Sequence, residues 1–252
     1  MRLTSALLFT SLICASAFAS TVASAQEDRR LDEHSYAEPN KVVIKDIALN
    51  LNVDFKQKIM SGSADLSLQW KQADTKQLSL DTRDLAIEKI EGSIDHKNWQ
   101  TLSYTLATRD AIFGSKLTID TPQAYTNVRI TYATSPQASG LQWLDAPLTA
   151  GKKLPFMFSQ SQAIHARSWV PLQDTPSVRF TYSAKITTPK NAMALMSADN
   201  APDAVRDGDY SFRMPQPIPS YLLAIAAGDF VFQPISKRVG VWAEPSVAKK
   251  AA

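Results

Sequence analysis

The sequence of 252 residues has one cysteine, Cys14, and three histidines, His34, His96 and His165. A single cysteine cannot form an internal disulfide, so we expect burial of a hydrophobic core to hold the fold together. The histidines are far apart in the sequence, and none has a partner at metal-ligand spacing. The sequence therefore predicts no metal site built by this chain.

The chain also lacks a strong charge of either sign. Its 27 Lys and Arg against 24 Asp and Glu give a formal net charge of +3. So small an excess does not produce the field that attracts nucleic acid or an anionic membrane surface. We predict neither partner.

The N-terminus has the pattern of a secretory signal peptide. A basic start at Arg2 precedes a short apolar segment, residues 6–15, and the small residues Ala23-Ser-Ala25 follow as a cleavage site. Ala17-Phe-Ala19 is a second possible cleavage site, and a membrane anchor is the alternative reading. The apolar segment is short for a bilayer span. We predict a signal peptide over 1–25, no stable membrane anchor after cleavage, and a periplasmic or secreted protein of a bacterial cell envelope.

The remainder of the chain shows the period of β-strands. Apolar residues alternate with polar ones from Ile47 to Phe55 and from Ala64 to Trp70, with a turn predicted at Ser61-Gly-Ser63. The same alternation recurs over 102–106, 128–132 and 178–186. We find no convincing helical pattern, and expect short turns only, such as one over 162–167. The prediction is a mostly β, antiparallel sandwich or saddle-like domain.

The last part of the chain departs from this alternation. The proline-rich segment 214–219 is predicted to be an extended connector, because proline has no backbone N–H for a sheet ladder. Residues 221–227 form a continuous apolar run, typical of a strand buried on both faces. Short strands are expected near 230–232 and 239–242, followed by the beginning of a helix around Pro245.

The chain contains three distinctive segments, Leu31–Pro39, Gln160–Tyr182 and Pro217–Gly228. In residues, order and spacing they resemble the N-terminal domain of zinc aminopeptidases of the leukotriene hydrolase and aminopeptidase N family. The resemblance implies a β-saddle domain over 26–228. It also implies that 229–252 are the short β start of a second, catalytic domain that is missing from this chain.

The zinc chemistry of such enzymes belongs to that second domain. Full-length relatives hold zinc with an H-E-x-x-H motif and bind the peptide's amino end with a G-x-M-E-N loop, and this sequence contains neither. The resemblance therefore implies a chain with no catalytic residue, no metal ligand and no cofactor of its own. It would meet a peptide substrate only together with a catalytic domain, and we expect the chain to be inactive alone.

One substrate-binding position carries over from the resemblance. Gln162 matches a family position that faces the catalytic pocket, where many members have glutamate, and Gln160 matches the glutamine before it. A side-chain carbonyl can accept a hydrogen bond from a substrate ammonium. The alternative is that both are ordinary loop amides.

Nearby, Arg167 and Asp174 are expected to pair and fix a turn, and His165 is expected to be a packing or surface residue.

Two functions of different classes follow. The first is the substrate-pocket wall of a zinc aminopeptidase, inactive alone. The second is a free-standing β-sandwich protein that binds peptides or a partner chain. An enzyme with chemistry of its own is a third, weaker reading.

Overall fold

The computed structural model describes residues 32–252, so the predicted signal peptide lies outside the described residues. Contacts group His34–Ala252 into one compact unit, which is described below. Within residues 32–252, no helix has the length and apolar character needed to span a bilayer.

Alternation of apolar and polar side chains defines the central strand, β1 (Val42–Asp54). Ile47, Leu49, Leu51 and Val53 are buried, whereas the residues between them are exposed or half-buried. Successive side chains of a strand point to opposite faces, so one face of β1 is apolar and the other polar. The predicted period of two is thereby confirmed.

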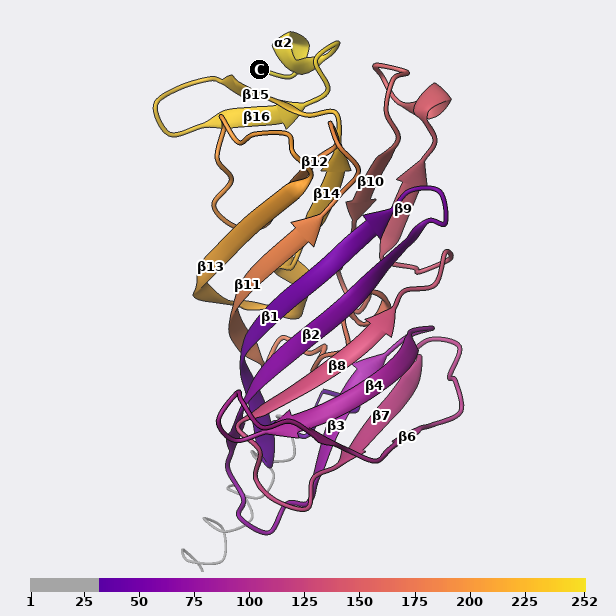
Figure 1. The fold of residues 1–252 in the computed structure, drawn as a ribbon, viewed down its shortest axis with the longest axis vertical. Coiled ribbons are helices and arrows are strands. Elements are labelled where there is room, and N and C mark those ends of the chain that lie inside the picture. Colours follow the sequence, from indigo (N-terminus) through magenta and orange to yellow (C-terminus); the bar gives the residue numbers. More distant parts are fainter. Residues whose placement is uncertain (1–31) are drawn as a thin grey trace, which may run out of the picture. The chain divides into compact units, whose positions relative to one another are not determined.

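Seven strands form the large sheet, in the order β13-β11-β1-β2-β8-β4-β5 (Figure 1). Every neighbouring pair is antiparallel except β1 and β11, which run parallel with Leu49 opposite Ala184. The other strands of this sheet are β2 (Ile59–Trp70), β4 (Ala86–Ser93), β5 (Gln100–Thr101), β8 (Asn127–Ala133), β11 (Arg179–Thr187) and β13 (Asp209–Pro219).

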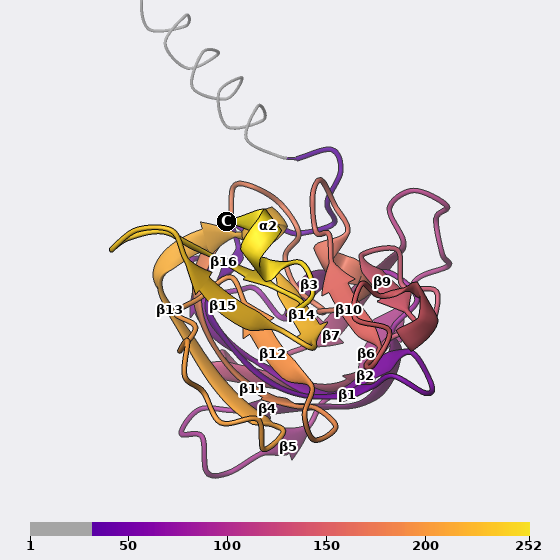
Figure 2. The ribbon, with the colours of Figure 1, turned by 90° about the horizontal axis from the view of Figure 1, so that it is seen from above.

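Three smaller sheets complete the unit, in the orders β12-β14-β10-β9, β3-β7-β6 and β15-β16. Figure 2 shows the large sheet curved, with β12, β14 and β10 on its inner side. Residues of the large sheet and of the two larger of these sheets share one hydrophobic core. The strands are β3 (Gln77–Thr82), β6 (Tyr104–Leu106), β7 (Ser115–Asp120), β9 (Leu141–Leu144), β10 (Phe156–Ser159), β12 (Met193–Met196), β14 (Ile225–Gly228), β15 (Val231–Pro234) and β16 (Gly240–Ala243).

Helical structure is confined to single turns, as expected. The 3-10 turns are η1 (Ala146–Leu148), η2 (Ala166–Ser168) and η3 (Ser220–Leu222), and the only α-helical turn of residues 32–252 is α2 (Ala248–Ala251). The unit is thus a mostly β fold of antiparallel sheets, as the sequence predicted.

The predicted turn of the first hairpin was wrong. The chain reverses between Asp54 and Ile59, where the Asp54 carboxylate accepts the Gln57 N–H and Lys58 adopts a positive φ of 57°. Gly62 lies inside β2, opposite Leu51. Glycine is found at position 62 because the backbones of β1 and β2 approach each other closely there, not because the chain turns.

The apolar run 221–227 is not one strand. Its first residues complete η3, which leaves Leu222 half-exposed, and β14 begins only at Ile225. The turn is closed by the bond from Leu223 N–H to the Ser220 carbonyl. Periodicity gave no sign of this bend, because every residue of the run is apolar or aromatic.

The proline-rich connector belongs instead to β13. Pairing jumps from Phe180 with Ile218 to Tyr182 with Met214, so residues 215–217 bulge out of the ladder. Because β13 is the edge of the large sheet, the prolines there face no further strand. Proline has no backbone N–H to donate to a neighbouring strand, but the outer side of β13 has no neighbouring strand in this sheet.

We predict that Gly62→Ala destabilises the protein by more than about 1 kcal/mol, because the residue has a positive φ that disfavours a side chain. An added Cβ would also lie 2.0 Å from the Asn50 carbonyl oxygen. Gly151→Ala is the matched control, since its Cβ would meet only a side-chain oxygen of Glu244, at 3.3 Å. Urea unfolding measures both, and equal losses for the two variants would contradict the assignment.

Candidate functional site

The two predicted substrate-binding glutamines follow strand β10 directly. Gln160 and Gln162 are exposed, whereas Ser161 between them is 3% exposed. This exposure pattern follows from the extended chain at the end of β10, in which neighbouring side chains alternate in direction. The structure therefore brings both glutamines to one surface.

Ser161 fixes this segment to the core. Its hydroxyl donates to the Leu223 carbonyl at 2.6 Å and accepts from the buried Trp169 indole at 3.1 Å. Its carbonyl accepts the His165 N–H at 2.9 Å, which closes the turn that carries Gln162. The peptide bond between Gln162 and Ala163 is cis.

The Gln162 side-chain amide makes no hydrogen bond within residues 32–252, while its backbone N–H lies 3.4 Å from the Gln160 side-chain oxygen. Both the carbonyl and the amino group of the Gln162 side chain are thus available to a ligand. The Gln160 backbone N–H donates to the Gly140 carbonyl at 2.9 Å, which connects the segment to the residue just before β9.

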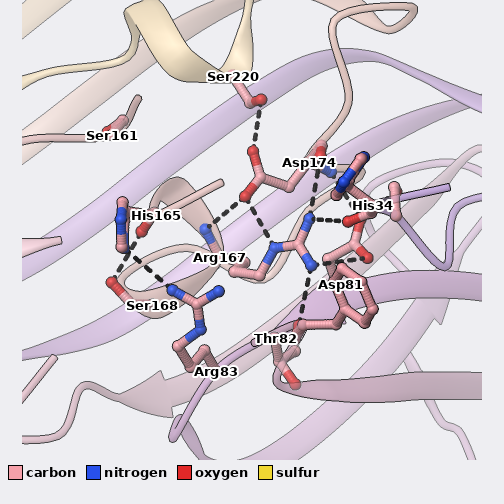
Figure 3. A network of polar contacts seen from close by, with 12 residues as sticks. His34, Asp81, Thr82, Arg83, Ser161, His165, Arg167, Ser168, Asp174 and Ser220 are labelled. Atoms are coloured by element: carbon pink, nitrogen blue, oxygen red, sulfur yellow. Dashed lines mark hydrogen bonds and ion pairs between the residues drawn. The ribbon is translucent and has the colours of Figure 1, made fainter. Parts of the chain in front are cut away.

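Beneath this surface, Arg167 places a fully buried guanidinium among four other segments (Figure 3). Its Nε donates to Asp174 Oδ2 at 2.9 Å, Nη1 to the Phe113 carbonyl at 2.8 Å, and Nη2 to the His34 carbonyl at 2.8 Å. Nη1 also lies 3.6 Å from Asp81 Oδ1. The predicted pair of Arg167 with Asp174 is confirmed.

The two carboxylates around Arg167 are bound in turn. Asp174 Oδ1 accepts from the Ser220 hydroxyl at 2.6 Å, which fastens η3 to the network. Asp81 accepts from the Ser35 hydroxyl and from the backbone N–H groups of Tyr36 and Asp174, at 2.6 to 2.8 Å. Burial raises the pKa of Asp81, and the nearby Arg167 charge and these donors oppose that rise.

Sequence reasoning missed Asp81 as a member of this network. Asp81 and Thr82 are the last residues of β3. An available signal was the acidic residue at the end of the alternating Leu78-Ser-Leu80 segment, because a carboxylate in a buried strand needs a partner.

His165 lies at the end of the turn that carries Gln162 and is half-buried. Its Nδ1 lies 3.0 Å from Arg83 Nη1 and 2.9 Å from the Ser139 hydroxyl. Burial, and then the positive charge of Arg83, lower the pKa of the His165 ring. The expected packing role is therefore accompanied by a polar contact to a second arginine.

Residues 32–252 contain no group of three or more His, Cys, Asp or Glu side chains placed to hold a metal ion. The acidic side chains Asp81 and Asp174 pair with Arg167, and the His165 ring contacts Arg83. These residues do not fit a zinc centre.

A groove of about 760 Å³ lies elsewhere, and neither glutamine lines it. It follows the polar face of β1, β2, β8 and β11, lined in part by Asn50, Ser63, Thr131 and Lys185. Gln160 and Gln162 lie instead on an open surface at the end of β10.

Comparison with known proteins defines the class to which this fold and site belong. A profile described as the peptidase M1 N-terminal domain matches residues 34–222. The chain therefore belongs to the family of M1 zinc aminopeptidases, as an N-terminal domain of that family.

Among the relatives, leukotriene A-4 hydrolase of Xenopus laevis is 39% identical over an alignment of 229 residues, which covers 84% of this chain and 36% of that protein. Leucine aminopeptidase 2 of Pyricularia oryzae is 38% identical, covering 82% of this chain and 34% of that protein. The chain thus spans about a third of the length of these relatives.

Solved structures agree on the fold. Leukotriene A4 hydrolase of Saccharomyces cerevisiae superposes with a TM-score of 0.79 at 30% identity, over 88% of this chain and 35% of that one. An M1 zinc metallopeptidase of Deinococcus radiodurans gives a TM-score of 0.60 at 19% identity, over 82% of this chain and 47% of that one, a likeness of fold alone.

We predict that Arg167→Met destabilises the protein by about 3–5 kcal/mol, because it leaves Asp81 and Asp174 as buried charges without their cation. Arg109→Met is the control, since Arg109 pairs with Asp84 at the surface and such pairs contribute little. Chemical unfolding compares the two, and a similar small loss for both would contradict the central role of Arg167.

Proposed function

We propose that this chain is the substrate-pocket wall of a secreted or periplasmic zinc aminopeptidase, an enzyme that removes N-terminal residues from peptides. The observation that carries the proposal is the pair Gln160 and Gln162, held on the buried Ser161 in a domain of the M1 peptidase family. Relatives named as leucine aminopeptidases support the reaction class.

In this proposal the Gln162 carbonyl accepts a hydrogen bond from the terminal ammonium of the peptide. A bond to a charged donor is stronger than one between neutral groups, although a glutamine lacks the charge of a carboxylate. Because Gln160 and Gln162 lie on an open surface, a second protein surface must close over them to form a pocket. A catalytic domain would supply that surface.

The chain itself would contribute binding and orientation, while zinc, when bound in full-length relatives, would activate the attacking water. The residues described above do not form a zinc centre, so no chemical step is assigned to them. Export is tested separately, by N-terminal sequencing of the protein recovered from the cell envelope, with Gln26 as the expected first residue.

A free-standing binding protein is the second candidate. The polar groove of about 760 Å³ on the large sheet favours it, because the residues that line this groove do not include either glutamine. Reading the coding sequence beyond residue 252 separates the candidates. A zinc motif there supports the peptidase, and its absence supports the binding protein.

We predict that the purified chain holds no stoichiometric zinc and does not cleave aminoacyl anilides. The sequence has only three histidines, which are widely spaced, and none is followed by glutamate as the H-E-x-x-H motif requires. Metal analysis after dialysis and an anilide assay test this, with a complete relative as positive control. One retained zinc per chain, or turnover that survives further purification, would show that the chain has its own chemistry.

A chimera tests the role of Gln162. When this chain is joined to the catalytic domain of a close relative, Gln162→Ala should lower kcat/KM by roughly ten- to a hundredfold, since losing a hydrogen bond to a charged group costs about 1.5–3 kcal/mol. Gln162→Glu should keep or raise the activity, because it adds the opposite charge to the ammonium. Zinc content should not change in either variant.

Gln142→Ala, at an exposed position of the neighbouring strand β9, is the matched control and should leave kcat/KM unchanged. An active parent chimera with unchanged kcat/KM in Gln162→Ala would show that Gln162 does not touch the substrate.

A further inference from the structure

The turn that presents Gln162 ends in a histidine ring that rests on an arginine. His165 Nδ1 lies 3.0 Å from Arg83 Nη1 (Figure 3). Both atoms also contact the Ser139 hydroxyl, each at 2.9 Å. The same histidine closes the turn through its backbone N–H, which donates to Ser161. Ring and turn are therefore parts of one unit.

Hydrogen-bond chemistry fixes the protonation state of this contact. A guanidinium has donors and no acceptor, so the nitrogen that faces it must accept. His165 Nδ1 therefore carries a lone pair, and the ring proton is on Nε2. A proton on Nδ1 would remove the acceptor and place a second cation 3.0 Å from Arg83 Nη1.

Arg83 cannot easily withdraw from the ring. It is 6% exposed, its backbone N–H donates to the Arg167 carbonyl at 2.9 Å, and its Nη2 donates to the Ile112 carbonyl. The His165 carbonyl, on the side away from Gln162, is also confined, because a Cβ on Gly140 would lie 2.6 Å from its oxygen. On protonation, the ring and the turn before it are therefore the parts that move.

The charged groups around the ring favour its neutral form. Arg83 and Arg167 are cations that oppose protonation, and Asp174 is the one acidic group that acts on the ring in the opposite direction. Asp174 is already bound by Arg167 and Ser220. Arg83 in turn lies near Arg109 and Asp84, whose charges oppose each other.

We propose that His165 is a positioning residue for Gln162, holding the 162–165 turn on Arg83 and Ser139 only while its ring is neutral. Protonation detaches the ring, and the turn that carries Gln162 shifts with it. In its consequence for peptides the inference rests on the proposed function, because a displaced Gln162 would bind a terminal ammonium less well in mildly acidic medium.

Nuclear magnetic resonance of the chain without substrate tests the coupling. The ring signals of His165 and the backbone and side-chain amide signals of Gln162 are followed from pH 8 to pH 5. We expect one common midpoint below the ordinary histidine value of about 6.5.

Two variants sharpen the measurement. Arg83→Gln removes the opposing charge and should move the His165 midpoint upward, toward about 6.5. His165→Gln keeps an uncharged polar side chain and should abolish the pH dependence of the Gln162 signals. If a variant does not fold, the common midpoint of the unaltered protein still decides the question.

Gln162 signals that stay constant while His165 titrates would overturn the proposal. So would a His165 midpoint that Arg83→Gln leaves unchanged. Because no peptide is present, either result is independent of whether Gln162 binds an ammonium. Conversely, a Gln162→Ala chimera of full activity would refute the substrate role and leave the coupling to His165 intact.

Discussion

The buried guanidinium of Arg167 is the constraint on which the rest of the site depends. One side chain satisfies the carbonyls of His34 and Phe113 and pairs with Asp174 and Asp81, which come from four separate segments. Asp174 then holds η3 through Ser220. A buried charge is tolerated only when its donors are used, so these segments must all be in place together.

This requirement explains the rigidity beneath an exposed site. The glutamines themselves lie at the surface, but the residues that carry them are bound on both sides, through Ser161 to Leu223 and Trp169 and through His165 to Arg83. Arg83 is joined to Arg167 by a backbone bond. A substitution that displaces the Arg167 side chain would therefore also disturb the surface that presents Gln162.

Several features could be predicted from the sequence because their causes are local. The alternation in β1 and β11 reflects burial of one face, and the pair Arg167 and Asp174 is separated by only seven residues. The family segment over 160–182 indicated the exposed glutamines. The placement of Gly62 in a strand, the bend at η3 and the edge position of β13 could not be predicted in this way. The first depends on pairing with β1 and β8, the second on the bond from Ser220 to Asp174, and the third on the order of strands in the sheet.

The sequence by itself determined the β class and the lack of an internal disulfide, and its resemblance to known domains indicated the family. The first two follow from residue type and spacing along the chain. Only the tertiary structure decided that Asp81 joins Arg167, that Arg83 faces His165, and that β1 pairs with β11 in parallel. The physical reason is that a charge or a strand edge is satisfied by whatever the fold places next to it, and that partner can lie more than eighty residues away.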